Sequence, residues 1–574
     1  MKLFFSPSFL AISALLFLSL FAIKDLAKPD FYTSHDGETH TARMAQYWQA
    51  LEDGQFPPRF AGSFYNGLGS PIFVYIYPLP YFLGSTLHTL GFSFVTSFKI
   101  LMALGFIFSG IFSYVWLNEL LKNQKAAFLG ALFYMWVPYR FLLIYVRGSL
   151  SEVLAYTFVP IVFYFLTRLA KNPNLFLTSA SAVAIALLLL SQNLVAAIAM
   201  PVIILYLLAI SLQNKSTKSV VFGVLAIVWG FSISAFTYLP AIFERKFTRF
   251  DEIITIAYPD HFVTLKQLVR SPWGYGFDLP GTVNDQISLQ IGLAHILVFL
   301  ISAILIVGLL VKRKTNADLF FAIFFMSIFV ASTFLMLQNK ITSSIWREIK
   351  LLHTIDIPWR LLGISSLALS VLSAYIAKSV KPGLFFLFLI AAVLVANRNH
   401  LRINQSLVRD DLFFLNYTGT ATQYNEFTPK WRQSTRVPIG FDQQVKVQSV
   451  SGRAQISNVA ASSREIKFTA ESAEKSQVRI NKFYFPGLVV GDNEQKLTLG
   501  DKLIITDTAT LHLDKEQDAS GLILINLDKG EHRITAVFGE TPLRTFANFL
   551  SLGVSLAALI AIGVKPFSRR NVKG

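Results

Sequence analysis

The densest group of side chains able to do chemistry lies in a polar segment just after the first apolar run of the chain. His35, Asp36, Glu38 and His40 fall within six residues of one another. A carboxylate can accept a proton from a hydroxyl, and carboxylates with imidazoles can bind a divalent metal. Three interpretations stay open: Asp36 caps a helix expected over 37–53, Asp36 and His40 bind a metal, or Asp36 is a catalytic carboxylate.

Each neighbour of Asp36 in this motif has more than one possible role. Glu38 is the second candidate for the catalytic carboxylate, and stabilisation of the helix N-terminus is the equally weighted alternative. His35 and His40 either tune Asp36, bind metal, or are solvated surface residues. We therefore expect Asp36 to be the catalytic carboxylate, with Glu38 as the second choice, and both histidines to contact the substrate.

Arginines near the ends of later apolar runs are candidates for contact with phosphate, which a guanidinium binds in a bidentate manner. Arg59 follows two prolines, and Arg360 follows Pro358-Trp359; both could instead be interfacial anchors. Arg147 either binds phosphate or pairs with Glu152, five residues further on.

Two more segments carry residues suited to a sugar, which offers apolar faces and hydroxyl groups. The loop 241–288 combines Tyr258, His261 and Trp273 with several glycines; the alternative is a packed lid without ligand contact. Glu426 lies at the start of a later polar region, and we expect it to close over the site.

The composition decides where these residues must be held. Hydrophobic residues make up 53% of the 574 residues, charged residues 15%, and the mean hydropathy is +0.51. Soluble globular domains carry about 25% charged residues, so these values exclude a soluble globule, and they exclude disorder as well. The net charge of +17 does not indicate nucleic acid, because the basic residues cluster at the ends of apolar runs. No cysteine is present, which excludes disulfides and thiolate chemistry.

About twelve apolar runs are long enough to span a bilayer. They lie near 5–23, 96–120, 126–145, 151–169, 175–191, 194–211, 219–240, 289–311, 317–337, 360–377, 382–397 and 544–563. Short basic connections include Lys122/Lys125, Arg168/Lys171, Lys215/Lys218, Lys312/Arg313/Lys314, Lys378/Lys381 and Lys565/Arg569/Arg570/Lys573. The positive-inside rule places these clusters and both termini in the cytoplasm, and the long loops 24–95, 241–288 and 398–543 outside.

The segment 71–90 is apolar enough to span, but a span there would move every basic cluster to the outer side. Its prolines Pro71, Pro78 and Pro80 also argue against a straight helix. We expect a juxtamembrane or re-entrant element that packs on the helix bundle.

The region 398–543 alternates polar and apolar residues, as in Val445–Val450, Glu465–Thr469 and Leu522–Ile525, with turn signals such as Pro486-Gly487 and Lys529-Gly530 between the runs. This alternation predicts an antiparallel β-sandwich inserted before the last helix.

Several motifs resemble a known family. His35-Asp-Gly-x-x-His40, Gly54-x-Phe-Pro-Pro-Arg59, Asn66-Gly-x-Gly-x-Pro-Ile-Phe73 and Tyr77-Pro-Leu-Pro-Tyr81 are similar to a bacterial membrane family labelled "6-pyruvoyl-tetrahydropterin synthase-related". The runs Tyr145–Glu152, Ile357–Arg360 and Glu426–Trp431 fit the same family. An acidic motif in the first outer loop also resembles the GT-C superfamily of membrane glycosyltransferases. No second histidine cluster supports the pterin chemistry in the family label.

The resemblance implies a GT-C-like polytopic helical membrane protein that moves a sugar from a polyprenyl-phosphate donor to an extracytoplasmic glycan, lipid or protein acceptor. It adds Asn66 to the substrate-binding residues. The expected domains are 1–397 with the catalytic loop 24–95, the β-sandwich 398–543, and 544–574 with the last helix and a basic tail. The expected partners are membrane lipid, donor and acceptor in the bacterial cytoplasmic membrane; the one cofactor left open is a divalent metal.

Other chemistries have little support in the sequence. It contains no G-x-x-x-x-G-K-[ST] loop and no G-x-S-x-G elbow. Ionisable residues are scarce inside the apolar runs, which argues against an ion-coupled transporter. The main alternative is a non-catalytic protein that binds or translocates lipid-linked glycan during envelope polysaccharide assembly.

Overall fold

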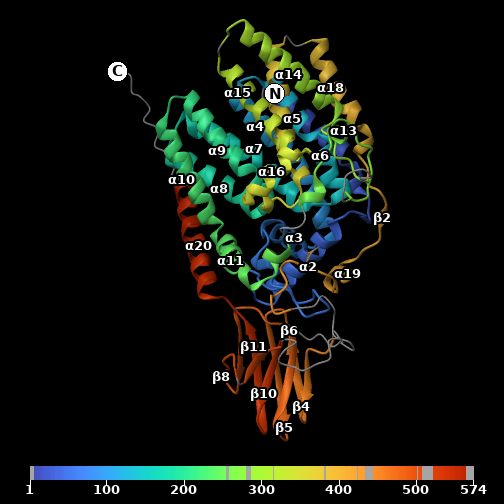
Figure 1. Ribbon diagram of the computed structural model, residues 1–574, viewed down its shortest axis with the longest axis vertical. Helices are drawn as coiled ribbons and strands as arrows, with labels where there is room; N and C mark the ends of the chain where they lie inside the picture. Colours follow the sequence, from blue (N-terminus) through green and yellow to red (C-terminus); the bar gives the residue numbers. More distant parts are fainter. Residues whose placement is uncertain are drawn as a thin grey trace.

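The computed structural model places a large bundle of helices at one end and two β-sheets at the other (Figure 1). It describes residues 6–253, 258–279, 286–314, 316–380, 383–422, 425–432, 444–500, 502–506 and 521–563. The predicted basic residues Lys381, Lys565, Arg569, Arg570 and Lys573 lie outside these ranges.

Each predicted apolar run forms a helix or a bent pair of helices, since a helix satisfies its own backbone hydrogen bonds in an apolar environment. These helices are α1 (Pro7–Ala22), α4 (Phe94–Leu121), α5 (Gln124–Met135), α6 (Pro138–Phe141), η3 (Leu142–Arg147), α7 (Leu150–Lys171), α8 (Leu175–Ser191), α9 (Asn193–Gln213), α10 (Thr217–Ile233), α11 (Ala235–Phe243), α14 (Leu293–Val311), α15 (Ala317–Met336), α17 (Leu362–Ser379), α18 (Leu384–Asn397) and α20 (Pro542–Gly563).

The structure supports a polytopic membrane protein without fixing the number of spans. In the described ranges, seven helices are long and apolar enough to cross a bilayer, or up to nine if each bent pair counts as one span. The pairs α5 with α6–η3 and α10 with α11 bend by 48° and 74°. The apolar helices α1, α8 and α18 are shorter, so the count of twelve stays a prediction.

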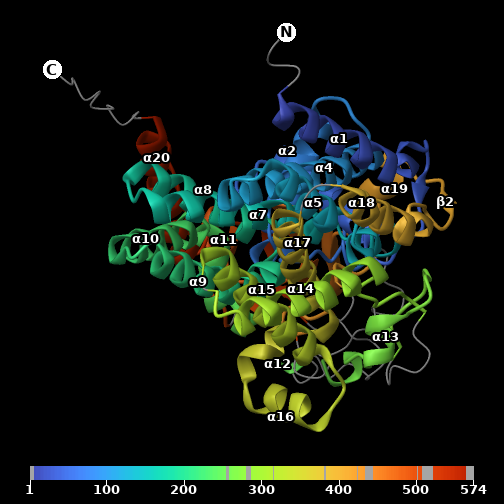
Figure 2. The same cartoon turned by 90° about the horizontal axis from the view of Figure 1, so that it is seen from above.

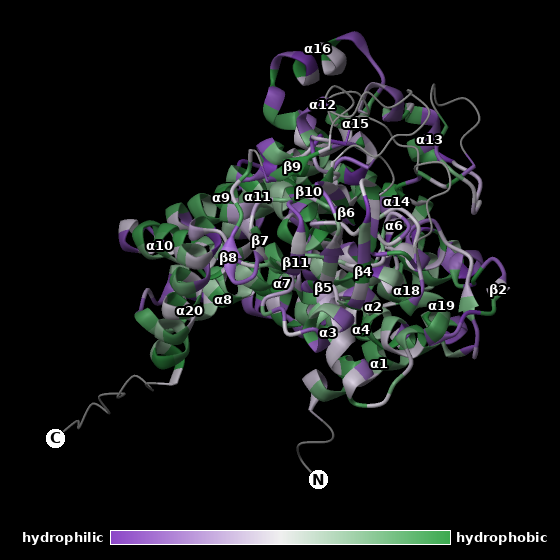
Figure 3. Ribbon diagram, turned by 90° about the horizontal axis from the view of Figure 1, so that it is seen from below, coloured by the Kyte–Doolittle hydropathy of each residue, from purple (hydrophilic) through white to green (hydrophobic). Residues whose placement is uncertain are grey.

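Helix α17 forms the centre of the bundle, with α5, α14 and α15 packed around it (Figure 2). Of its most apolar window, 89% is buried inside the protein, compared with 22% for α14 and for α20. The outer helices α10 and α20 are mostly hydrophobic in Figure 3. The bundle therefore buries α17 and turns the apolar faces of α14 and α20 outward, as a lipid-facing helix requires.

The segment 71–90 does not form a spanning helix. It contains a short turn, η2 (Ile72–Val74), and the 11-residue helix α3 (Leu79–Thr89), which packs on α2 (Gly37–Glu52) and α4. Pro80 occupies the first turn of α3, where a missing N–H costs no hydrogen bond.

The C-terminal region contains two antiparallel sheets, in the orders β3-β6-β10-β9 and β4-β5-β11-β7-β8. Their buried side chains belong to one hydrophobic cluster, which joins Ile480 and Ile525 of the first sheet to Phe468 and Ile534 of the second. The strands are β3 (Val447–Ser451), β4 (Ala454–Ala461), β5 (Glu465–Ser472), β6 (Ser476–Phe483), β7 (Leu488–Asp492), β8 (Gln495–Lys496), β9 (Leu503–Ile505), β10 (Leu522–Leu527) and β11 (Gly530–Phe538).

The first part of the predicted β-region packs on the polar segment that follows α1 instead of joining the sheets. Strand β2 (Ser406–Leu407) pairs antiparallel with β1 (Phe31–Tyr32), and α19 (Asp411–Leu415) packs on α2. Shorter elements complete the described fold: η1 (Lys24–Ala27), η4 (Arg245–Phe247), α12 (Phe250–Ile253), η6 (Tyr258–His261), α13 (Leu265–Val269), α16 (Lys340–Glu348), η7 (Lys350–Thr354), η8 (Pro358–Leu361) and η9 (Arg398–His400). Helices α2, α3 and α19 lie between the bundle and the sheets (Figure 1).

Candidate functional site

Two glycines bring the start of α2 against the turn that follows η3. A Cβ on Gly148 would lie 3.0 Å from the Cα of Gly37, and Gly148 has a φ of +62°, a conformation that glycine adopts without strain. The Asp36 N–H donates to the Arg147 carbonyl at 2.7 Å, and the His35 N–H donates to Val146 at 3.1 Å. This contact fixes Asp36 next to Arg147.

Asp36 is the first member of a chain of ion pairs. Arg147 Nη2 lies 2.9 Å from Asp36 Oδ2, and Arg147 Nη1 pairs with Glu152 Oε1. Asp36 stands at the N-cap position of α2, but its side chain makes no capping hydrogen bond. The carboxylate therefore serves the ion pair with Arg147 and not the helix terminus.

Glu152 lies at the centre of the network and is 1% exposed. Arg360 Nη1 approaches its Oε1 at 3.1 Å, and the Tyr139 hydroxyl donates to its Oε2 at 3.1 Å. Arg360 Nη2 continues the chain to Asp356 at 3.2 Å. A buried carboxylate needs such partners, because an unpaired one is strongly destabilising.

Asp36 is the solvent-accessible end of this network, with 36% of its side chain exposed. Burial raises the pKa of the Asp36 carboxyl, but the charges of Arg147 and then Arg360 lower it more, so the net pKa lies below the ordinary value. Asp36 is therefore an anion at neutral pH, and one that can accept a proton from solvent or from a bound hydroxyl.

The two histidines of the motif have different surroundings. His35 stacks on Phe277 with ring centroids 4.4 Å apart, and its Nε2 lies 3.2 Å from the Tyr275 carbonyl. His40 is buried, with Nδ1 3.0 Å from the Tyr81 hydroxyl. Burial and the charge of Arg43 lower the pKa of His40 to about 3, so this side chain is neutral.

The loop 241–288 reaches the network through Trp359. The indole N–H of Trp359 donates to Asp278 Oδ2 at 2.8 Å, and His261 Nδ1 lies 2.6 Å from the same oxygen. The Arg147 guanidinium lies over the Trp359 ring at 5.5 Å from its centroid. Burial lowers the pKa of His261, but Asp278 raises it more, so that the net pKa lies above the ordinary value.

The structure thus brings together Asp36, Arg147, Glu152 and Arg360, which lie up to 324 positions apart (from 36 to 360) in the sequence. His35 flanks them and His261 is connected through Asp278. Sequence reasoning missed Asp356 and Tyr139. The spacing of Asp356 four residues before Arg360, typical of a helical ion pair, was a usable signal; nothing in the sequence marked Tyr139.

Other predicted residues lie elsewhere. Glu38 pairs with Arg409 at 2.7 Å. Arg59 is 3% exposed and donates to Glu540, Asn548 and the Phe236 carbonyl. Asn66 has a φ of +58° in a turn, where its N–H donates to Thr418.

The aromatic candidates pack against protein side chains. Tyr258 stacks on Trp346 and His353, and Trp273 stacks on His400 with centroids 4.3 Å apart. Glu426 has one buried carboxylate oxygen without a hydrogen-bond partner in the described part of the chain. In the described part of the chain, none of these three residues forms a hydrogen bond, ion pair or ring contact with Asp36 or Arg147.

The predicted metal ligands do not form a complete set in the structure. Within the described ranges, no three or more His, Cys, Asp or Glu residues are placed to hold a metal ion. The Asp36 carboxylate faces Arg147, and the His40 ring faces Tyr81 and Arg43. These side chains therefore do not fit a shared metal ion.

Fold and site define a polytopic helical membrane protein with an ion-pair network where the bundle meets the start of α2. The segment 73–266 matches the model of the 6-pyruvoyl-tetrahydropterin synthase related domain, which is described as a membrane protein. The predicted family resemblance is therefore confirmed for this segment.

An uncharacterized protein of Lactococcus lactis subsp. cremoris (strain MG1363) is 24% identical over 240 residues, which is 40% of this chain and 39% of that protein. Among solved structures, the mycobacterial arabinofuranosyltransferase AftD is similar with a TM-score of 0.42 and 14% identity, over 69% of this chain and 27% of AftD. The oligosaccharyltransferase of Archaeoglobus fulgidus has a TM-score of 0.42 and 11% identity, over 75% of this chain and 62% of that enzyme. The chain thus spans less than two thirds of each of these proteins.

Proposed function

We propose that this protein is an integral membrane glycosyltransferase that moves a sugar from a polyprenyl-phosphate donor to an acceptor hydroxyl, with Asp36 as the base. The acceptor oxygen attacks the anomeric carbon, and the bond from that carbon to the phosphate oxygen breaks with its electron pair on the phosphate. The hydroxyl proton goes to Asp36. A single displacement of this kind inverts the configuration at the anomeric carbon.

The observation that carries the proposal is the Asp36 carboxylate itself, which is partly exposed yet fixed by a buried network. A proton acceptor must be ionised, accessible and positioned. Arg147 keeps Asp36 ionised and oriented, and Glu152 with Arg360 holds Arg147 in place. The leaving phosphate is already an anion, so the reaction needs no acid to expel it.

A carboxylate with a lowered pKa is a weak base, and this fits the chemistry. An alcohol hydroxyl becomes strongly acidic only once its oxygen has begun to bond to the anomeric carbon. Proton transfer to Asp36 then comes late, when a weak base suffices. The protein contribution is mainly positioning and electrostatic stabilisation.

The proposal includes the membrane arrangement expected from the charge pattern. Asp36 and the β-sheets would face the outer side of a bacterial cytoplasmic membrane, and the basic connections and termini the cytoplasm. The two sheets of strands β3 to β11 would form a sandwich that binds the acceptor glycan, outside about twelve spans in 1–397 and 544–574. Asn66, Tyr258, Trp273 and Glu426 would reach the larger substrate groups.

The test is release of polyprenyl phosphate in nanodiscs that contain the purified full chain. The probes are monosaccharides linked to polyprenyl phosphate, supplied with a glycan extract as acceptor and followed by mass spectrometry. Asp36→Asn keeps the shape of the side chain but removes the proton acceptor, and we expect roughly a 10²–10⁴-fold loss of turnover.

Glu38→Gln is the matched control, because Glu38 lies in the first turn of the same helix and pairs with Arg409 instead of Arg147. It should turn over as the wild type does. Transfer that persists in Asp36→Asn contradicts the base assignment. Donor binding without any release, in wild type and variant alike, favours a protein that binds or translocates lipid-linked glycan.

A further inference from the structure

Arg140 lies in α6, at the bend between α5 and η3, and is 2% exposed. Its Nε, Nη1 and Nη2 atoms are all buried, and none has a hydrogen-bond partner among the residues that the structure describes. No ion pair of Arg140 is found in those ranges either. This differs from Arg59, Arg147, Arg360 and Arg544, each of which pairs with a carboxylate.

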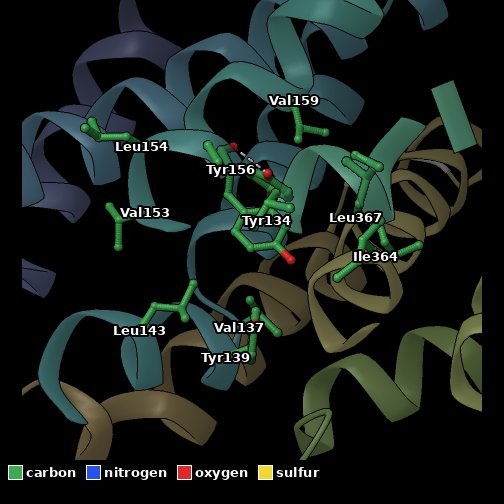
Figure 4. Close-up of a cluster of buried hydrophobic side chains, with 14 of the residues drawn as sticks. Tyr134, Val137, Tyr139, Leu143, Val153, Leu154, Tyr156, Val159, Ile364 and Leu367 are labelled. Atoms are coloured by element: carbon green, nitrogen blue, oxygen red, sulfur yellow. Dashed lines mark hydrogen bonds between the residues drawn. The ribbon is translucent and has the colours of Figure 1, made fainter. Parts of the chain in front are cut away.

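Aromatic rings provide the surroundings of this guanidinium. Its centre lies 5.7 Å from the ring of Tyr134 and 5.8 Å from the ring of Tyr156. Figure 4 shows Tyr134 and Tyr156 side by side, near Ile364 and Leu367 of α17. The Tyr134 hydroxyl donates to the Tyr156 carbonyl at 2.6 Å, so it is already engaged.

Within the described ranges, these contacts leave the charge and the N–H donors of Arg140 without an acceptor. Cation–π contacts offset part of the cost of burying a charge, but they take none of the five N–H donors of a guanidinium. A buried charge without a partner is strongly destabilising. An anionic acceptor oxygen would satisfy both the charge and the donors.

The position of Arg140 relative to the candidate site indicates which anion this is. Its neighbour in the chain, Tyr139, donates to Glu152. The hydroxyl of Tyr156 lies 3.5 Å from the carbonyl of Arg360. Arg140 is therefore connected to the network that holds Asp36 through its chain neighbour Tyr139 and through Tyr156, whose ring lies 5.8 Å from its guanidinium.

We propose that Arg140 binds a phosphate monoester, the group that ends an isoprenoid lipid phosphate. The inference rests on the proposed function for its choice of lipid: the departing phosphate needs a cation, and Arg147 and Arg360 are occupied by carboxylates. Arg140 supplies that cation, and its planar fork matches two phosphate oxygens.

The experiment measures binding and thermal unfolding of the full chain in nanodiscs, with wild type, Arg140→Met and Arg347→Met. Arg347 is a matched control because its side chain is 71% exposed. The probes are farnesyl phosphate, farnesol and inorganic phosphate. Farnesyl phosphate should raise the Tm of wild type and of Arg347→Met, and its Kd should be about 10- to 100-fold weaker for Arg140→Met, the loss expected for hydrogen bonds to a charged group.

Without ligand, Arg140→Met should have a Tm equal to or above that of wild type, because it removes an unpaired buried charge. A lower Tm, or failure of this variant to fold, overturns the proposal, since it shows that the charge is satisfied within the protein. Equal protection of all three chains, or protection of none, overturns it too. Protection by farnesyl phosphate but not by inorganic phosphate identifies the lipid as the source; protection by both identifies a site open to free phosphate.

Asp36→Asn separates this inference from the proposed function. It should bind farnesyl phosphate as wild type does. Loss of sugar transfer in Asp36→Asn, together with unchanged binding by Arg140→Met, rejects the Arg140 site and leaves the base assignment intact. Sugar transfer that is retained in Asp36→Asn, together with weaker binding by Arg140→Met, rejects the base assignment and leaves the Arg140 site intact.

Discussion

Two networks of buried arginines and carboxylates hold this protein together, and they differ in what they leave open. One connects Asp36, Arg147, Glu152 and Arg360 at the start of α2, α7 and α17. The other lies where α11 and α20 meet the sheets. There Arg544 pairs with Glu244 at 2.7 Å, and Arg59 pairs with Glu540 at 3.0 Å.

In the second network, the Arg544–Glu244 pair is closed on every side. The Arg544 side chain is 0% exposed, and besides Glu244 it donates to the carbonyls of Gly539 and Pro486. Glu244 also accepts from the Thr541 hydroxyl. In the first network, by contrast, the Asp36 carboxylate is partly exposed. The same residue types thus build a scaffold in one place and a candidate site in the other, and remaining accessibility distinguishes them.

The largest expected effect comes from removing the central arginine of each network. Arg147→Met and Arg544→Met each leave a buried carboxylate without a main partner, which typically costs about 3–5 kcal/mol. Both variants should therefore lose thermal stability in nanodiscs. Only Arg147→Met should also lose sugar transfer per folded molecule, by about a hundredfold or more, because Asp36 loses its orientation. Equal loss of transfer in both variants would contradict the distinction.

In the sheets, the buried Lys482 should make the stability of the protein depend on pH. Lys482 is buried, donates to the Ser463 carbonyl at 2.7 Å, and lies over the Phe60 ring. Burial lowers its pKa from 10.5 to about 7. Between these values the unfolded chain binds a proton that the folded chain does not, so stability rises with pH from about 7 to about 10.

The measurement is the Tm of wild type and Lys482→Met across that pH range. The lysine contribution to the rise should disappear in the variant. Lys467→Met, on the exposed side of the same sheets, is the control and should keep the rise. A rise of equal size in all three chains would assign it to other groups.

The pH dependence of transfer should differ from that of stability. Asp36 has a lowered pKa and His40 a pKa of about 3, so neither changes charge between pH 5 and pH 8. The acid limb of kcat/KM should therefore lie below the ordinary carboxyl pKa of about 3.9. A limb near pH 6.5 that vanishes in Asp36→Asn would place the base pKa far above what Arg147 allows.

The smallest effects concern groups at the edge of the site. Glu38→Gln removes a surface pair with Arg409, which is worth about 0.2–1 kcal/mol, so the Tm should change little. Chelation by EDTA should leave transfer unchanged, because the described donors around Asp36 do not form a metal site. A loss of transfer in EDTA that Mn²⁺ restores would favour the metal role predicted for Asp36 and His40.

Much of this arrangement follows from local patterns in the sequence. Apolar runs locate the helices, period-two alternation locates β5, a short apolar run locates β10, and the expected helix 37–53 is α2 within one residue. The pairing of Arg147 with Glu152 was one of two alternatives open from the sequence, and the structure contains it.

The sequence could not show which buried charges have a partner in the folded protein. Arg59 and Arg147 looked alike as phosphate ligands, yet Arg59 is closed by Glu540, 481 residues further along the chain. Arg140 gave no signal at all, because nothing local shows that a buried guanidinium lacks a partner. Such differences depend on long-range packing, which local patterns do not encode.

Asp36 can act as proposed only if it faces the side on which the sheets lie. The chain has no cysteine, so Asp36→Cys, Glu474→Cys and Lys312→Cys each carry a single thiol for a membrane-impermeant maleimide applied to intact cells. The account predicts that residue 36 and the sheet residue 474 react at once, and that residue 312 reacts only after the membrane is permeabilised. Labelling of residue 36 only after permeabilisation would contradict it.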